Sequence, residues 1–211
     1  MDIQERIDGI IPALKEAYPD PMCALHYDRD YELMVAVRLS AQCTDERVNL
    51  VTPALFARYP TLDALADADV SEVENLVHSC GFYKHKAQDI VLACQMLRSR
   101  FGGKVPDNME DLLSLPGVGR KTANLLLGDI YKVPGSVVCD THCIRISNKL
   151  GIAEGKEPEK VETQLRSILP PEESSDFCHR LVLHGRAICT ARNPQCARCP
   201  LAPFCKSFTG E

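Results

Sequence analysis

The sequence predicts an all-α protein. Three observations point that way: apolar residues recur at the three- and four-residue spacing of helices, capping residues precede these runs, and glycine or proline follows them. Strand-like alternation is nearly absent, and no Asn-Gly type of hairpin signal separates two apolar runs. With 211 residues, the chain can bury a substantial core as one large domain or two smaller ones.

The helices can be followed along the chain by their start and stop signals. Asp2 with Glu5 three residues later is a capping-box pattern ahead of an apolar helical run. Ser71 with Glu74 gives a second such box, and Gly81 ends that helix. About ten helices are expected in all, including those at 84–101, from Asp107 with Glu110 to Leu115-Pro116, at 141–150 before Gly151, and at 159–169 before Pro170-Pro171.

Composition is that of an ordinary globular protein, with 45% hydrophobic and 25% charged residues. No run approaches the roughly 20 apolar residues of a membrane span. The N-terminal stretch lacks the basic start and short apolar core of a secretory signal. We therefore expect a cytoplasmic protein with no export signal and no membrane partner.

The eleven cysteines are unevenly placed. Without an export signal they indicate a reducing compartment, in which thiols stay free or bind metal. Seven are scattered and are expected to be small buried hydrophobes: Cys23, Cys43, Cys80, Cys94, Cys139, Cys143 and Cys178. The other four form a C-x6-C-x2-C-x5-C pattern, which predicts a metal site, although the spacing alone does not separate zinc from an iron–sulfur cluster: Cys189, Cys196, Cys199 and Cys205.

Charge is segregated along the chain. The net charge of −5 taken alone argues against a nucleic-acid partner. However, residues 61–76 hold five acids and no base, whereas residues 177–206 hold five Lys or Arg and no acid. Such asymmetry permits one basic face on an acidic protein, and ordinary solvated charge is the alternative.

The stretch "LPGVGRKTAN" at 115–124 lies between two expected helices. It is not a dinucleotide-binding loop, because no strand precedes it and Thr122 stands where the third glycine would be, and it lacks the GxxxxGK spacing of a Walker loop. We expect a tight interhelical hairpin in which Gly117 and Gly119 take positive φ or allow close backbone approach. Free N–H groups at the next helix start would bind an anion such as a DNA phosphate, although a plain turn remains open for this stretch alone.

The hairpin does not stand alone. Together with "LSAQCTDERVN" at 39–49, "GFYKHKA" at 81–87, "VVCDTHCIRISNKLG" at 137–151 and "HGRAIC" at 184–189, it resembles the endonuclease III family of helix-hairpin-helix DNA glycosylases. The resemblance runs from Tyr31 to Cys205. It implies a [4Fe–4S] cluster at the four clustered cysteines.

The resemblance also implies two helical domains with a catalytic cleft between them. Residues 22–132 would form a six-helix domain that carries the hairpin at about 107–131. Residues 1–21 plus 133–211 would form the cluster domain. Asp140 would then face Lys121 across the cleft.

Individual roles follow from the matching positions. The resemblance makes Lys121 the nucleophile and Asp140 the catalytic carboxylate, and we expect partial burial and the helix N-terminus to favour the uncharged Lys121 amine. Taken alone, Asp140 is expected to be a helix cap, and His142 is expected to have a structural role. Gln42 and Phe82 match residues that fill the gap left by an extruded base, although leucine is more familiar at the second position.

The implied activity is that of a monomeric enzyme that acts on double-stranded DNA, excises oxidised pyrimidines and cleaves abasic sites. Arg192 and Arg198 would be aimed at the DNA backbone by the cluster loop, in which Asn193 and Gln195 dilute the charge found in familiar members. A monofunctional glycosylase and a non-catalytic DNA-binding scaffold remain as alternatives. Reductive trapping of a covalent adduct and cleavage of abasic DNA separate them from the bifunctional enzyme.

Overall fold

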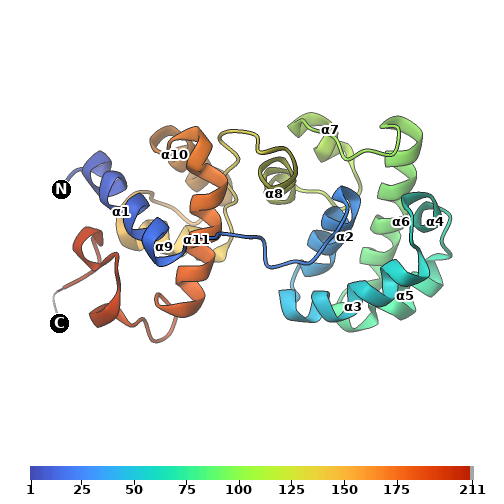
Figure 1. Ribbon diagram of the computed structural model, residues 1–211, viewed down its shortest axis with the longest axis horizontal. Coiled ribbons are helices and arrows are strands. Elements are labelled where there is room, and N and C mark those ends of the chain that lie inside the picture. Colours follow the sequence, from blue (N-terminus) through green and yellow to red (C-terminus); the bar gives the residue numbers. More distant parts are fainter. Residues whose placement is uncertain (210–211) are drawn as a thin grey trace. The chain divides into compact units, whose positions relative to one another are not determined.

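The structure, a computed structural model, describes residues 1–209, and every regular element within them is helical (Figure 1). This confirms the all-α prediction. The chain divides into two compact units. One spans Cys23–Tyr131, and the other combines Met1–Met22 with the segment from Lys132 onward.

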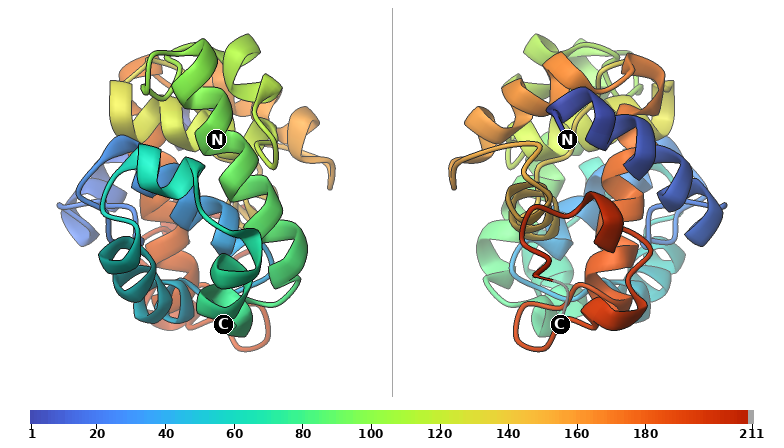
Figure 2. Two further views of the ribbon diagram at one scale, coloured as in Figure 1. Left: turned by 90° about the vertical axis from the view of Figure 1, so that its right-hand side faces the viewer. Right: turned by 90° about the vertical axis from the view of Figure 1, so that its left-hand side faces the viewer.

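The unit Cys23–Tyr131 is built around one long helix. That helix, α6 (Tyr83–Arg100), contacts α2, α4 and α5, and Figure 2 (left) shows it crossing the unit beside them. Its buried stripe includes Ala87, Ile90, Cys94 and Leu97, which supply the core. The other elements of this unit are α2 (Asp30–Ser40), α3 (Asp45–Arg58), α4 (Leu62–Ala66), α5 (Val70–Val77), the 3-10 turn η1 (His78–Cys80), α7 (Met109–Ser114) and α8 (Arg120–Tyr131).

The other unit joins the N-terminal helix to the C-terminal part of the chain. Helix α1 (Ile3–Ala17) contacts α11 (Ser174–Ala187), α10 (Pro158–Ile168) and the 3-10 turn η4 (Ala202–Phe204) (Figure 2, right). Helix α9 (Thr141–Leu150) contacts α11, and the remaining 3-10 turns are η2 (Pro171–Glu173) and η3 (Cys196–Arg198). The predicted capping box at Asp2 and Glu5 is present.

Two predicted caps are wrong by one or two residues. Asp69, rather than Ser71, caps α5, since its carboxylate accepts the Ser71 N–H at 2.7 Å. Asn108, rather than Asp107, caps α7 by accepting the Asp111 N–H at 3.0 Å. In both places several capping residue types stand close together, and spacing alone does not choose among them.

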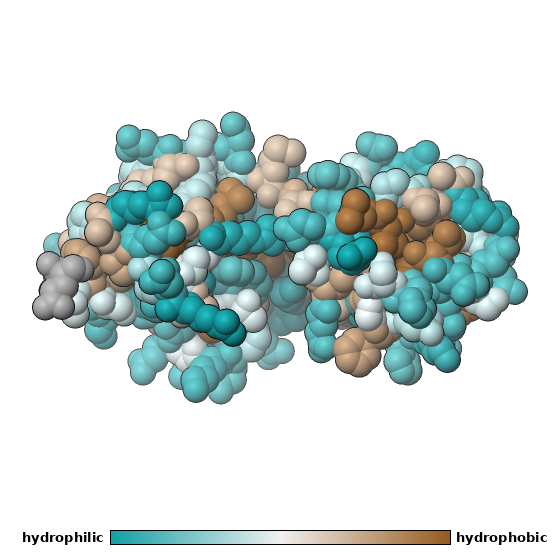
Figure 3. Space-filling model, turned by 90° about the horizontal axis from the view of Figure 1, so that it is seen from below, coloured by the Kyte–Doolittle hydropathy of each residue, from teal (hydrophilic) through white to brown (hydrophobic). Residues whose placement is uncertain are grey.

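The scattered cysteines are only partly as expected. Five of them are buried, whereas Cys23 and Cys43 are half-buried. Hydrophilic side chains cover most of the visible face of each unit, and apolar side chains gather in one area of the unit Cys23–Tyr131 (Figure 3). Within residues 1–209, no helix combines the length and apolar character needed to cross a membrane.

The turn between α7 and α8 depends on one glycine. Gly117 has φ +74°, and a Cβ added there would lie 2.5 Å from Arg38 Nε and 2.9 Å from Asp89 Oδ2. Those two side chains form an ion pair, with Arg38 Nε 2.8 Å from Asp89 Oδ2. Only glycine therefore fits between the hairpin and this pair.

Gly119 differs from what the sequence predicts, because its φ is not positive. A Cβ added at Gly119 would have no heavy atom of the described chain within 4 Å. Gly119 is thus required neither by backbone conformation nor by internal packing. Its bare backbone instead leaves open space just before the first turn of α8.

The two glycines make a matched pair for a stability measurement. Gly117→Ala is expected to lower the free energy of unfolding by roughly 1–3 kcal/mol, because alanine must adopt a left-handed conformation and displace the Arg38–Asp89 pair. Gly119→Ala is expected to change it by less than about 0.5 kcal/mol. Urea unfolding of both variants checks this, and equal losses would contradict the assigned role of Gly117.

Candidate functional site

Lys121 lies in the first turn of α8, two residues after Gly119, and its side chain is exposed. The expectation of partial burial at Lys121 is wrong. The amine stands instead at the positive end of a twelve-residue helix, where the helix dipole attracts anions. A primary amine and backbone groups of the kind that bind anions therefore occupy the same helix end.

Asp140 is the N-cap of α9. Its Oδ1 accepts the Cys143 N–H at 2.7 Å, and the residue is half-buried with an extended backbone. The neighbouring His142 packs against α11, since a Cβ at Gly185 would lie 2.3 Å from His142 Nδ1. Burial lowers the pKa of His142, and the Asp140 carboxylate opposes that shift.

Gln42 lies at the tip of a tight turn directly after α2. Ala41 has φ −58° and ψ 112°, Gln42 has φ 54°, and the Cys43 N–H donates to the Ser40 carbonyl at 3.0 Å. These are the features of a type II β-turn, whose third position favours glycine. Glutamine at that position costs on the order of 1–3 kcal/mol, and its side chain is exposed.

Phe82 shows the same unusual combination. It follows Gly81, has φ 47° and ψ 28°, and precedes α6, yet its side chain is 66% exposed. Burial in the core is therefore excluded as the reason for an aromatic residue here. Among residues 1–209, Gln42, Phe82 and Lys132 are the non-glycine residues with positive φ, and Lys132 directly follows the end of α8, where helices commonly take this conformation.

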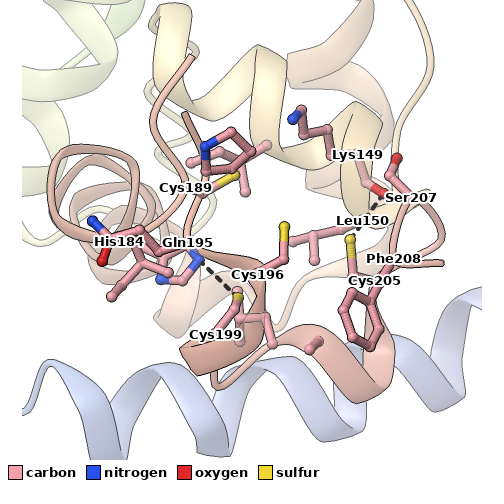
Figure 4. A pocket seen from close by; sticks show the side chains of 15 residues that line it. Lys149, Leu150, His184, Cys189, Gln195, Cys196, Cys199, Cys205, Ser207 and Phe208 are labelled. Carbon is pink, nitrogen blue, oxygen red and sulfur yellow. Dashed lines mark hydrogen bonds between the residues drawn. The ribbon is translucent and has the colours of Figure 1, made fainter. Parts of the chain in front are cut away.

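The four clustered cysteines line one cavity of about 50 Å³, together with residues of α9 and α11 (Figure 4). A single water needs roughly 10–15 Å³, so the space suits a group larger than one water. Burial raises the pKa of Cys199, and the neighbouring Cys189, Cys205 and Cys196 raise it further.

This donor set fits a multi-iron cluster. Among residues 1–209, no three His, Cys, Asp or Glu side chains converge closely enough to hold a lone metal ion. The four thiols instead surround the cavity, and thiolates are the ligands that iron–sulfur clusters use.

Polar groups from the helices reach these sulfurs. Cys199 Sγ lies 3.5 Å from His184 Nε2, while the Tyr18 hydroxyl lies 3.2 Å from His184 Nδ1. Burial lowers the pKa of His184 to about 4, with Arg145 contributing, so its imidazole is neutral near neutral pH. Arg145 Nη1 also donates to Cys189 Sγ at 3.6 Å. Such contacts orient thiolate ligands and stabilise their negative charge.

The predicted DNA-contact residues of the loop, Arg192 and Arg198, are both exposed. The loop has little apolar content of its own, but its backbone is tied by the Gln195 N–H to the Ile188 carbonyl at 2.9 Å. Thr190 Oγ1 closes a further turn by donating to the Asn193 carbonyl at 2.7 Å. Two cationic side chains are thus displayed on a loop whose cysteines line the cavity.

One residue was missed at the level of sequence. Lys86 is buried, with 1% of its surface exposed, although "GFYKHKA" was interpreted only through Phe82. Helical spacing does indicate burial of Lys86, because Lys86 stands four residues before Ile90 on the apolar stripe of α6.

Comparisons with known proteins identify the family of this chain. Residues 35–171 match the model of the HhH-GPD superfamily of base excision DNA repair proteins. Residues 189–205, bounded by the first and last of the four clustered cysteines, match the iron–sulfur binding domain of endonuclease III.

Whole-chain relatives agree as well. The chain is 46% identical to endonuclease III of Synechocystis sp. over 97% of this chain and 93% of that protein. It is 38% identical to endonuclease III of Escherichia coli over 93% of each. A solved structure of a trapped endonuclease III–DNA covalent intermediate matches with TM-score 0.91 and 38% identity, covering 98% of this chain and 97% of that one. A thermostable thymine-DNA glycosylase, at 19% identity and TM-score 0.82, shares the fold.

The matched segments extend over both units, and they include both the hairpin and the four clustered cysteines. The chain therefore belongs to the endonuclease III family of the HhH-GPD superfamily, and it is a DNA glycosylase and AP lyase of base excision repair that carries a [4Fe–4S] cluster.

Proposed function

We propose that Lys121 is the nucleophile both for removal of the damaged base and for cleavage of the DNA strand. Its uncharged amine attacks C1′ of the damaged nucleotide and forms a C–N bond as the glycosidic bond breaks and the base departs with the electron pair and a proton. Opening of the sugar gives an imine. Loss of the C2′ proton then forms a carbon–carbon double bond, and the 3′ phosphate leaves with its electron pair.

Asp140 supports this chemistry electrostatically. Its carboxylate stabilises the positive charge that develops on the sugar as the base departs. The cap to Cys143 N–H uses Oδ1, so the second carboxylate oxygen remains for this purpose.

The observation that carries the proposal is the exposed amine at the start of α8, next to open space at Gly119. A phosphate accepting N–H groups of this helix end would bring the neighbouring sugar to the amine. The trapped covalent intermediate of the related endonuclease III supports a covalent route in this family.

The substrate class is double-stranded DNA that contains oxidised or ring-damaged pyrimidines, or abasic sites, bound by a monomer in the cytoplasm. Gln42 and Phe82 fill the gap left by the extruded base: glutamine can hydrogen-bond the orphaned partner, and phenylalanine can stack. Their exposure and their costly backbone conformation support this role, since neither is explained by core packing.

The loop adds a grip on the DNA backbone. Cys189, Cys196, Cys199 and Cys205 are the proposed cluster ligands, and the bound cluster supplies a covalent scaffold for a loop that is poor in apolar residues. Arg192 and Arg198 then contact phosphates without reading sequence.

Replacing the nucleophile tests the proposal most simply. Lys121→Gln is expected to abolish both borohydride trapping and base excision, because an amide cannot form the imine. The assay compares duplexes that contain thymine glycol, uracil, 8-oxoguanine or an abasic site. Activity of the wild type on thymine glycol and the abasic site is expected, and trapping by Lys121→Gln would contradict the assignment.

The carboxylate can be separated from the helix cap. Asp140→Asn keeps an N-capping side chain, so thermal stability and DNA affinity should be nearly unchanged while single-turnover excision slows by roughly 10²–10⁴-fold. Asp140→Ala is expected to lose about 0.5–2 kcal/mol of stability in addition. An unchanged single-turnover excision rate in Asp140→Asn would mean that Asp140 has only a structural role.

Salt dependence tests the loop arginines. Arg192→Ala and Arg198→Ala should each reduce the slope of log Kd against log salt by about one, with similar loss on damaged and undamaged duplexes. Lys160→Ala, an exposed lysine on α10, serves as the control. A slope that stays at the wild-type value in both arginine variants would remove them from the interface.

A further inference from the structure

The ammonium group of Lys86 connects the two turns that carry Gln42 and Phe82. Lys86 Nζ donates to the Leu39 carbonyl at 2.8 Å and to the Cys80 carbonyl at 2.6 Å. Leu39 lies three residues before Gln42, and Cys80 lies two residues before Phe82. One buried amine therefore fixes the chain just before both turns.

Each acceptor belongs to the end of a helix. Leu39 is in the last turn of α2, and Cys80 ends η1. Carbonyls at such ends lack helical partners and carry partial negative charge, which a cation compensates. Lys86 thus caps two helix ends at once, and it does so from the first turn of a third element, α6.

A second contact joins the same two segments. Burial raises the pKa of Cys80 to about 11, and the nearby Cys43 side chain raises it further. Cys43 directly follows Gln42, so the segments on which both turns depend lie beside each other on this side of the Gln42 turn as well. Both cysteines are free thiols in the described chain.

Stability alone does not explain a lysine at this position. Its neighbours on the buried stripe of α6 are Ala87, Ile90 and Val91, and an apolar side chain there would avoid the cost of removing an ammonium group from water. What the amine adds is a fixed geometry for two turns whose tips hold strained, exposed side chains.

We propose that Lys86 is a positioning residue for base extrusion, because it holds the Gln42 and Phe82 turns at the fixed separation needed to enter the DNA stack together. This inference rests on the proposed roles of Gln42 and Phe82. Lys86 itself touches no DNA. It acts through the two backbone carbonyls.

The test uses the cluster-loaded enzyme with Lys86→Met. We expect single-turnover excision of thymine glycol to fall roughly 10- to 100-fold, while Kd for undamaged duplex stays within about twofold, because phosphate contacts do not depend on the turns. A 2-aminopurine placed opposite the lesion reports loss of stacking. Its fluorescence rise on enzyme binding should be largely lost in Lys86→Met.

The control is Lys104→Met, which removes an exposed lysine from the same unit and should leave the rate, Kd and fluorescence unchanged. Lys86→Gln provides a second variant if Lys86→Met does not fold. Its shorter side chain cannot span both carbonyls, so partial loss of rate and of fluorescence is expected in folded protein. Wild-type fluorescence and rate in whichever of these variants folds would overturn the proposal.

A mutant cycle separates this proposal from the one on which it rests. Gln42→Ala with Phe82→Ala should slow excision, and adding Lys86→Met to that pair should change little, because the residues it positions are already gone. If the double variant excises at the wild-type rate, the assignment of Gln42 and Phe82 fails. If the double variant is slow and Lys86→Met still adds its full effect, only the role of Lys86 fails.

Discussion

The contact between Gly117 and the Arg38–Asp89 ion pair is the constraint on which the hairpin that carries Lys121 depends. Because Gly117 has a left-handed backbone and no Cβ, α2 and α6 can support the turn through this pair. The conformation of this turn then determines where α8 begins. The position of the Lys121 amine therefore follows from a glycine four residues earlier and from two side chains more than thirty residues away in the chain.

The unit Cys23–Tyr131 also holds strained residues at an exposed surface. Gln42 and Phe82 have backbone conformations that other residue types adopt more easily, and neither side chain contributes to the core. Such conformations persist only when surrounding contacts determine them. The hydrogen bonds of Lys86 to Leu39 and Cys80 are contacts of that kind. The strained backbone at Gln42 and Phe82 and the hydrogen bonds that support it thus lie in one local arrangement around α6.

Much of the fold could be predicted from sequence because it depends on local signals. Helical spacing located α1 and α9, and the cysteine spacing located a cavity lined by four thiols. Cap positions failed where Asp69 and Asn108 compete with nearby residues of similar capping strength. The burial expected at Lys121 and the positive φ expected at Gly119 failed because both depend on tertiary surroundings that no local pattern encodes. Helical spacing places Lys86 on the apolar stripe of α6, but its hydrogen bonds could not be predicted, since the partners lie 47 and 6 residues away.

The proposed chemistry requires that one amine, at the start of α8, bond covalently to the sugar of damaged DNA. The most direct measurement is borohydride reduction of the wild-type enzyme with an abasic duplex, followed by proteolysis and mass spectrometry of the crosslinked peptide. We expect a single adduct whose fragments place the sugar on Lys121. An adduct on a different side chain, or none in enzyme that cleaves the duplex, would contradict it.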